Sequence, residues 1–209
     1  IIFLPVLYIN NTMKKIFTLI IGICSIAGLQ AQSTVVGTTT YDLQTNGGNK
    51  SRLLVHDDGT VSAMWTGSTS GTISFTDRGM FFNSSPDGTT WGAFPTTRIE
   101  PTRTGFGDMV KVGDHEVMFS HDGTNIYVFK NDELGGTSWT PTAGSLQITG
   151  LWPNAYCPEG TDDIYVVNAN SSTPTGVYFS KSTDGGESWD ILEYTLPYLT
   201  TDECFDAIG

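Results

Sequence analysis

The sequence predicts an all-β protein built from a repeated unit of short antiparallel strands. Glycine contributes 24 of the 209 residues and only 15% of the residues are charged, a composition typical of strands joined by tight turns. No stretch after residue 31 shows the sustained apolar period of an amphipathic helix. A self-match at about 50 residues indicates that the unit is repeated along the chain.

The first 31 residues have the pattern of a targeting segment. Residues 1–12 precede the first methionine, Met13, and we interpret them as non-native upstream translation. From Met13 the chain has two lysines, an apolar run of 14 residues and then Ala31, which is typical of a secretory signal peptide over 13–31. That run is shorter than the ~20 residues that span a bilayer, so we expect no membrane span in the exported chain. Residues 32–209 are therefore expected to be secreted or held at the cell surface.

The expected exported chain is strongly acidic. Because residues 1–31 hold two lysines and no Asp or Glu, residues 32–209 carry 22 acidic against 8 basic side chains. Binding to nucleic acid or to an anionic membrane requires clustered Lys and Arg. The charge thus argues against a nucleic-acid partner.

Three copies of a Trp-terminated segment define the repeat. They end at Trp91, Trp139 and Trp189, spaced 48 and 50 residues apart, and an aromatic strand precedes each one. Equivalent positions lie 17 residues after each Trp: Asp108, Tyr156 and Asp206. Four strands per unit of this length are typical of a β-propeller. At roughly 49 residues per blade, residues 32–209 make about three and a half blades, which we interpret as part of a six-bladed propeller.

The last Trp-terminated segment reads S-T-D-G-G-E-S-W and resembles the Asp-box, or BNR repeat, of secreted bacterial sialidase-like propellers. The first copy lacks one residue, and the 132–139 copy has Leu134 in place of the Asp. The resemblance covers about residues 50–209 and implies a structural box on an outer hairpin of each blade. The box residues are Ser85, Asp87, Gly88, Trp91, Gly135, Gly136, Trp139, Ser182, Asp184, Gly186 and Trp189.

The resemblance to sialidases also implies where a catalytic site would lie. Arg52 matches by position the first arginine that the family uses for the sugar carboxylate, but the flanking Tyr and Pro and the second arginine are absent. Asp77 is the only Asp in the interval where the family has its acid/base, and Asp108 and Asp206 are alternatives at the inner end of a blade. The Tyr nucleophile and the remaining arginines would come from later blades.

Three functional interpretations stay open. The leading hypothesis is a secreted, non-catalytic module that binds an extracellular glycan or a cell-surface protein through Arg52, Asp77, Arg78 and Asp108. The alternative is an exo-sialidase-type glycoside hydrolase with Arg52, Asp77 and Asp108 as catalytic candidates. The third is a purely structural secreted scaffold.

Cys157 and Cys204 are the two cysteines of the expected exported chain. They lie at similar depth at the start of adjacent repeats, and an oxidising compartment permits a blade-to-blade disulfide, the alternative being two buried thiols. The three histidines, His56, His115 and His121, show no recognised ligand spacing, so we expect no metal site. No cofactor motif is present in the sequence.

Overall fold

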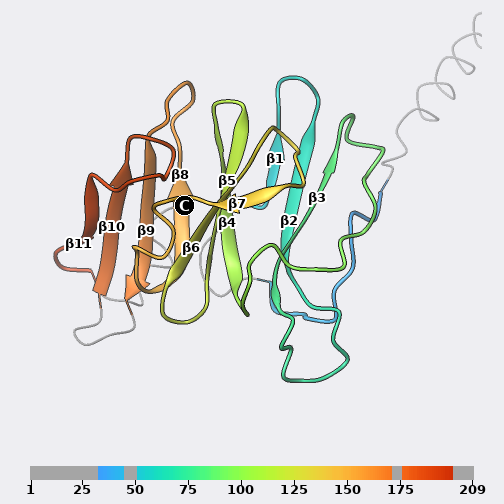
Figure 1. Cartoon of the computed structure of the whole chain (residues 1–209), viewed down its shortest axis with the longest axis horizontal. Coiled ribbons are helices and arrows are strands. Elements are labelled where there is room, and N and C mark those ends of the chain that lie inside the picture. Colours follow the sequence, from blue (N-terminus) through green and yellow to red (C-terminus); the bar gives the residue numbers. More distant parts are fainter. Residues whose placement is uncertain (1–32, 45–50, 171–175, 200–209) are drawn as a thin grey trace, which may run out of the picture. The chain divides into compact units, whose positions relative to one another are not determined.

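The computed structural model describes residues 33–44, 51–170 and 176–199 of the chain. Every regular element in these residues is a β-strand, and the strands form three antiparallel sheets that follow one another in chain order (Figure 1). Within these ranges there is no helix with the length and apolar character needed to cross a membrane. The expected signal peptide lies outside the described residues.

The first sheet has the strand order β1-β2-β3. Its strands are β1 (Leu53–Val55), β2 (Val61–Gly67) and β3 (Gly79–Ser85). The turn between β1 and β2 is the expected Asp-Gly pair, in which Asp58 Oδ1 accepts the N–H of Thr60 at 2.9 Å and Gly59 has a φ of 91°. The positive φ explains the glycine, because side chains with a Cβ rarely adopt it.

The second and third sheets each have four strands, as the repeat predicts. The second sheet runs β4 (Gly105–Val112), β5 (His115–His121), β6 (Ile126–Asn131) and β7 (Trp139–Pro141). The third runs β8 (Leu151–Tyr156), β9 (Ile164–Asn170), β10 (Gly176–Ser182) and β11 (Ile191–Thr195).

The first sheet departs from this pattern, because no fourth strand is formed in its described residues. The segment after Trp91 bonds to β3 only near the two ends of that strand. Gly92 N donates to Ser84 O at 3.1 Å, and Ile99 N donates to Met80 O at 2.9 Å. Pro95 lies between these contacts and has no N–H to contribute to a ladder.

Apolar side chains fill the spaces between neighbouring sheets. Between the first and second sheets the buried cluster consists of Met64, Met80, Phe82, Met109, Met118 and Phe129. A second buried cluster joins the second and third sheets and includes Val110, Phe119, Ile126, Ile148 and Ile164. Burial of this apolar surface is the main stabilising contribution and packs the first strands of the sheets together, with β4 in contact with β1 and β8. The arrangement is that of consecutive blades of a β-propeller.

The inner strands β4 and β8 share a bulge. The pairing register shifts between Gly105 and Asp108 in β4, and between Leu151 and Asn154 in β8. The structure therefore makes Asn154, and not Tyr156, the equivalent of Asp108, which corrects the alignment expected from Trp spacing. The spacing misleads because the segment after Trp91 is irregular, whereas β7 begins directly at Trp139.

Buried carboxylates link the first blade to the second. Glu116 of β5 is fully buried; its Oε1 lies 2.8 Å from His56 Nε2, and it accepts a hydrogen bond from the hydroxyl of Ser62. Glu100, at 2% exposure, accepts the N–H of Met80 at 2.9 Å and the hydroxyl of Ser120. Because a buried carboxylate without hydrogen bonds would be strongly unfavourable, these contacts fix how the two blades pack.

Candidate functional site

Arg52 and Asp108 are brought together where the inner strands begin. Arg52 precedes β1, and its Nε donates to the carbonyl of Gly107 at 3.2 Å. Burial lowers the pKa of Arg52, and the negative charge of Asp108 opposes that shift. Asp108 itself is fully buried, and its carboxylate accepts backbone N–H groups of Ser51 at 2.6 Å and Ala155 at 2.7 Å. This pair is therefore part of the packing between inner strands.

Asp77 is held by the loop that precedes it. Its carboxylate accepts the hydroxyl of Ser68 at 2.5 Å, the N–H of Thr69 at 2.7 Å and the N–H of Ser70 at 3.0 Å. These bonds, with that of Ser68 as the largest cause, lower the pKa of Asp77 to about 2. A carboxylate with this pKa is ionised at neutral pH and is poorly suited to donate a proton.

Arg78, the neighbour of Asp77 in the sequence, points into a different environment. Its guanidinium lies against the rings of Tyr41 and Phe106, with Cζ 5.1 Å from each ring centroid. The four residues predicted to form one site are thus divided among the inner strands, a surface loop and an aromatic enclosure.

The Trp-terminated segments form the turns that follow the third strand of each blade. In the first, Asp87 Oδ1 accepts the N–H groups of Thr89 at 2.8 Å and Thr90 at 2.6 Å, and these bonds lower the pKa of Asp87. In the third, Asp184 Oδ1 accepts the N–H of Ser188 at 2.9 Å and the hydroxyl of Ser182 at 2.8 Å. Both Asp side chains therefore bond to donors of their own turns.

The second copy, which carries Leu134 in place of the Asp, has an acceptor from another strand. Glu116 of β5 accepts the N–H of Gly135 at 3.0 Å, and Asn131 Nδ2 donates to the carbonyl of Gly136 at 3.2 Å. The φ angles of Gly88, Gly135 and Gly185 are 71°, 72° and 71°, so the backbone turns in the same way in all three copies.

The Trp residues of the second and third turns pack toward the preceding blade. Trp139 meets Phe82 edge to face at 5.0 Å, and Trp189 Nε1 donates to the carbonyl of Gly144 at 2.9 Å. Trp91 is half-buried. Ser85, Gly186 and the other box residues take no part in lining the cavity described below.

Cys157 Sγ lies 3.5 Å from the carbonyl oxygen of Thr161. Burial raises the pKa of this thiol. Cys204 and Asp206 lie outside the described residues, so the disulfide between Cys157 and Cys204 stays a prediction. In the part of the chain that the structure describes, no three His, Cys, Asp or Glu side chains group as metal ligands.

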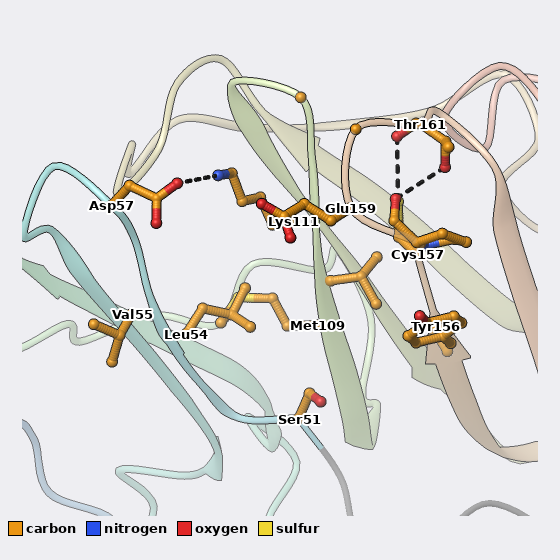
Figure 2. Close-up of a pocket in the computed structure, with 15 residues that line it drawn as sticks. Ser51, Leu54, Val55, Asp57, Met109, Lys111, Tyr156, Cys157, Glu159 and Thr161 are labelled. Carbon is orange, nitrogen blue, oxygen red and sulfur yellow. Dashed lines mark hydrogen bonds and ion pairs between the residues drawn. The ribbon is translucent and has the colours of Figure 1, made fainter.

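A cavity of about 560 Å³ lies where the inner strands of the blades end. β1, β4 and β8 form its walls, and the loop after β8 covers one end. Its polar lining includes Ser51, Asp57, Lys111, Tyr156, Glu159 and Thr161 (Figure 2). A pocket shared by several blades is the usual place for a ligand in a fold whose inner strands converge.

The chemistry of this cavity is mixed. Lys111 Nζ lies 3.9 Å from Asp57 Oδ2, and the Asp57 side chain is 95% exposed, so this ion pair is weak and its members remain free to meet a ligand. Tyr156 is 58% exposed, so its ring is accessible to a ligand. Its ring, two carboxylates and one ammonium group line a single space.

Sequence reasoning missed this cavity. It treated Tyr156 only as a repeat marker and Cys157 only as a disulfide candidate, and it assigned no role to Lys111 or Glu159. The glycines after β4 and β8 could have indicated the cavity residues, because they mark the turns that end these inner strands. Gly113 and Gly160 both have a positive φ, at 57° and 76°. Residues next to such turns lie at the open end of a blade.

No protein-family model matches the chain, and no curated protein matches its sequence. Among solved structures it is similar to Zg3597, a family 117 glycoside hydrolase from the marine bacterium Zobellia galactanivorans, with 14% identity and a TM-score of 0.52. The match covers 79% of this chain and 64% of the hydrolase, so the chain spans less than two thirds of that protein. A weaker similarity to GH43B of the Bacteroides ovatus xyloglucan PUL has 15% identity, a TM-score of 0.45 and coverage of 77% and 32%. At 14% identity the likeness to the family 117 hydrolase shows the fold alone, a β-propeller.

Proposed function

We propose that this chain is a glycan-binding propeller module that acts outside the cell. The observation that carries the proposal is the cavity between β1, β4 and β8, into which all three blades contribute and at which the ring of Tyr156 is exposed. Export through the segment 13–31 is part of the proposal. Detection of the protein in the culture medium by immunoblot would test it, and retention of the protein in the cytoplasm would contradict it.

The lining of the cavity suits a sugar. An exposed aromatic ring offers an apolar face on which the C–H groups of a pyranose can pack, and its hydroxyl remains available for hydrogen bonding. The carboxylates of Asp57 and Glu159 are acceptors for sugar hydroxyls, whereas the ammonium group of Lys111 is a donor. An apolar surface with a few convergent polar groups is the general design of a small-ligand site.

The hydrogen bonds that the predicted catalytic carboxylates make within the protein favour binding without hydrolysis. Asp77 accepts hydrogen bonds from its own loop, and Asp108 accepts backbone N–H groups from both neighbouring inner strands. A general acid or base must reach the substrate within hydrogen-bond distance, directly or through one water. Neither carboxylate lines the cavity. The sialidase-type hydrolase is therefore the less supported alternative.

Tyr156→Ala tests the proposal. Wild-type protein would be screened on an oligosaccharide array, and the affinity of the best ligand would then be measured by calorimetry. We expect Tyr156→Ala to weaken binding by about tenfold, because the stacking surface is lost. Tyr194→Ala is the matched control, since Tyr194 is 59% exposed on β11 and does not line the cavity.

Two results would contradict the proposed function. One is an affinity that Tyr156→Ala and Tyr194→Ala change equally. The other is release of the fluorophore from a fluorogenic sialoside by the folded wild-type protein, which would favour the hydrolase.

A further inference from the structure

Arg78 is a buried arginine with unused hydrogen-bonding capacity. It is 8% exposed, its Nε donates to the carbonyl of Thr104 at 2.8 Å, and its Nη1 donates to the hydroxyl of Tyr41 at 3.2 Å. Nη2 donates to none of the residues that the structure describes. The rings of Tyr41 and Phe106 lie on the guanidinium, so its orientation is fixed.

A second arginine, Arg103, bonds to the same stretch of backbone as Arg78. The carbonyl of Phe75 accepts both the backbone N–H of Arg78 at 3.0 Å and the Nε–H of Arg103 at 3.1 Å. The backbones are also joined, because Thr104 N donates to Arg78 O at 3.1 Å. Burial and the neighbouring charge of Arg103 lower the pKa of Arg78, as expected for two close cations.

In the part of the chain that the structure describes, no carboxylate forms an ion pair with either arginine. Among the described residues, the ion pairs involve Lys111, Lys130, Lys181 and two histidines, and none involves an arginine. This is notable in a chain whose acidic residues outnumber its basic residues by 22 to 10. Two adjacent cations without a counter-ion repel each other, and a bound anion would relieve that repulsion.

Two of the six described residues other than glycine that have a positive φ lie at the same place. Phe75 and Phe106 have φ angles of 43° and 55°, values that cost roughly 1–3 kcal/mol for a residue other than glycine. Both rings pack around Tyr41, with centroid distances of 5.1 Å and 6.3 Å. Phe106 thus contacts Arg78 directly and Phe75 supports Tyr41. Strain retained around a functional group is typical of a binding site.

We infer that Arg78 and Arg103 bind a single carboxylate or sulfate group carried by a sugar. The planar guanidinium fork matches both groups, which present oxygens in a similar arrangement. A polyanion is disfavoured as a ligand because the acidic chain repels it at long range. A single anionic group interacts mainly with Arg78 and Arg103. The inference adds a second, anion-specific site to the proposed glycan-binding function and is independent of the cavity near Tyr156.

Titration followed by NMR tests this site with defined small probes. Glucuronic acid supplies the carboxylate, glucose 6-sulfate supplies the sulfate, and glucose supplies neither. We expect at least one acidic probe to shift the Nε–H signals of Arg78 and Arg103 in a saturable way, with glucose binding about tenfold more weakly. The acidic probe that binds more tightly shows whether the site prefers a carboxylate or a sulfate.

The variant Arg103→Gln removes one cation from an exposed position and leaves Arg78 in its enclosure. We expect its dissociation constant for the preferred acidic probe to rise about fivefold or more, and Arg103→Lys to recover part of the loss. Lys130→Gln is the control, because it removes the same charge from a residue that pairs with Glu187.

Equal affinity in Arg103→Gln and wild type, or equal binding of glucose and both acidic probes, would overturn the inference. Failure of Tyr156→Ala to affect an uncharged oligosaccharide would instead contradict only the function proposed for the cavity.

Discussion

Asp108 and Ala155 are joined by a hydrogen bond of 2.7 Å from the backbone N–H of Ala155 to Oδ2 of the carboxylate. Oδ1 of the same carboxylate accepts the N–H of Ser51, two residues before β1, at 2.6 Å. One buried side chain therefore links the inner strands of three consecutive blades. The residue is expected to contribute to stability, although sequence comparison made it a candidate for catalysis.

Replacement of Asp108 with Asn should destabilise the fold. An amide has one acceptor oxygen, so its NH₂ group would face a backbone N–H that the carboxylate now satisfies. We expect a loss of about 3 kcal/mol in the free energy of unfolding, measured by urea denaturation. An unchanged unfolding midpoint would contradict this role, and oligosaccharide affinity of the folded variant should equal that of wild type.

Glu100→Gln should make stability less sensitive to pH. Burial raises the pKa of Glu100, so the folded state holds its proton more tightly than the unfolded state does. Wild-type stability therefore falls as the pH rises from about 4, where the unfolded side chain begins to ionise. The amide keeps an acceptor for Met80 N but cannot ionise.

The measurement is the difference in Tm between Glu100→Gln and wild type across that range. We expect the difference to become more positive from about pH 4 to about pH 7. A constant difference would show that Glu100 has no raised pKa in the folded protein.

Asp77 should contribute stability with the opposite pH dependence. Its pKa is lowered to about 2, so its contribution is complete above the unfolded value of about 4 and is lost as the pH falls toward 2. Asp77→Asn should therefore lower Tm at pH 7 but have little effect near pH 2. Circular dichroism melts of both proteins at several pH values would check this, and an effect of equal size at both ends would contradict it.

Asp184→Ala should open the turn between β10 and β11. The change removes the acceptor for Ser188 N, Ser188 Oγ and Ser182 Oγ, and we expect a loss of about 1–2 kcal/mol. Asp190→Ala is the control in the same segment, where one hydroxyl, that of Thr183, donates to the carboxylate. Equal unfolding free energies for the two variants would argue against a structural role for Asp184.

The blades could be predicted from the sequence because each is encoded locally. Asp-Gly turns such as Asp58-Gly59, aromatic strands and Trp-terminated turns recur in the same order, and the observed strands β3, β6 and β10 precede those turns as expected. The missing fourth strand of the first blade could not be predicted from the repeat, since it depends on Pro95 and on how residues 92–98 attach to β3.

The candidate site was less accessible to sequence reasoning. The sequence indicates three charged residues near inner strands, Asp77, Arg78 and Asp108. Their spacing does not show which of these side chains are already hydrogen-bonded to other groups of the protein. Nothing in the sequence distinguishes Glu116 from the other acidic residues, and its partner His56 lies 60 residues earlier in the chain. Tyr156 and Glu159 gain their significance from the convergence of β1, β4 and β8, which is a property of the assembled blades.

The bonds that cross between blades also impose an order on biosynthesis. Asp108, which accepts the N–H of Ser51, is synthesised 57 residues after Ser51. Ala155, the other backbone donor to Asp108, follows 47 residues later. A ribosome adding about 5–20 residues per second would leave the first blade with unsatisfied polar groups for several seconds. Until Asp108 has been synthesised, the first blade therefore lacks one of the bonds that join it to its neighbours.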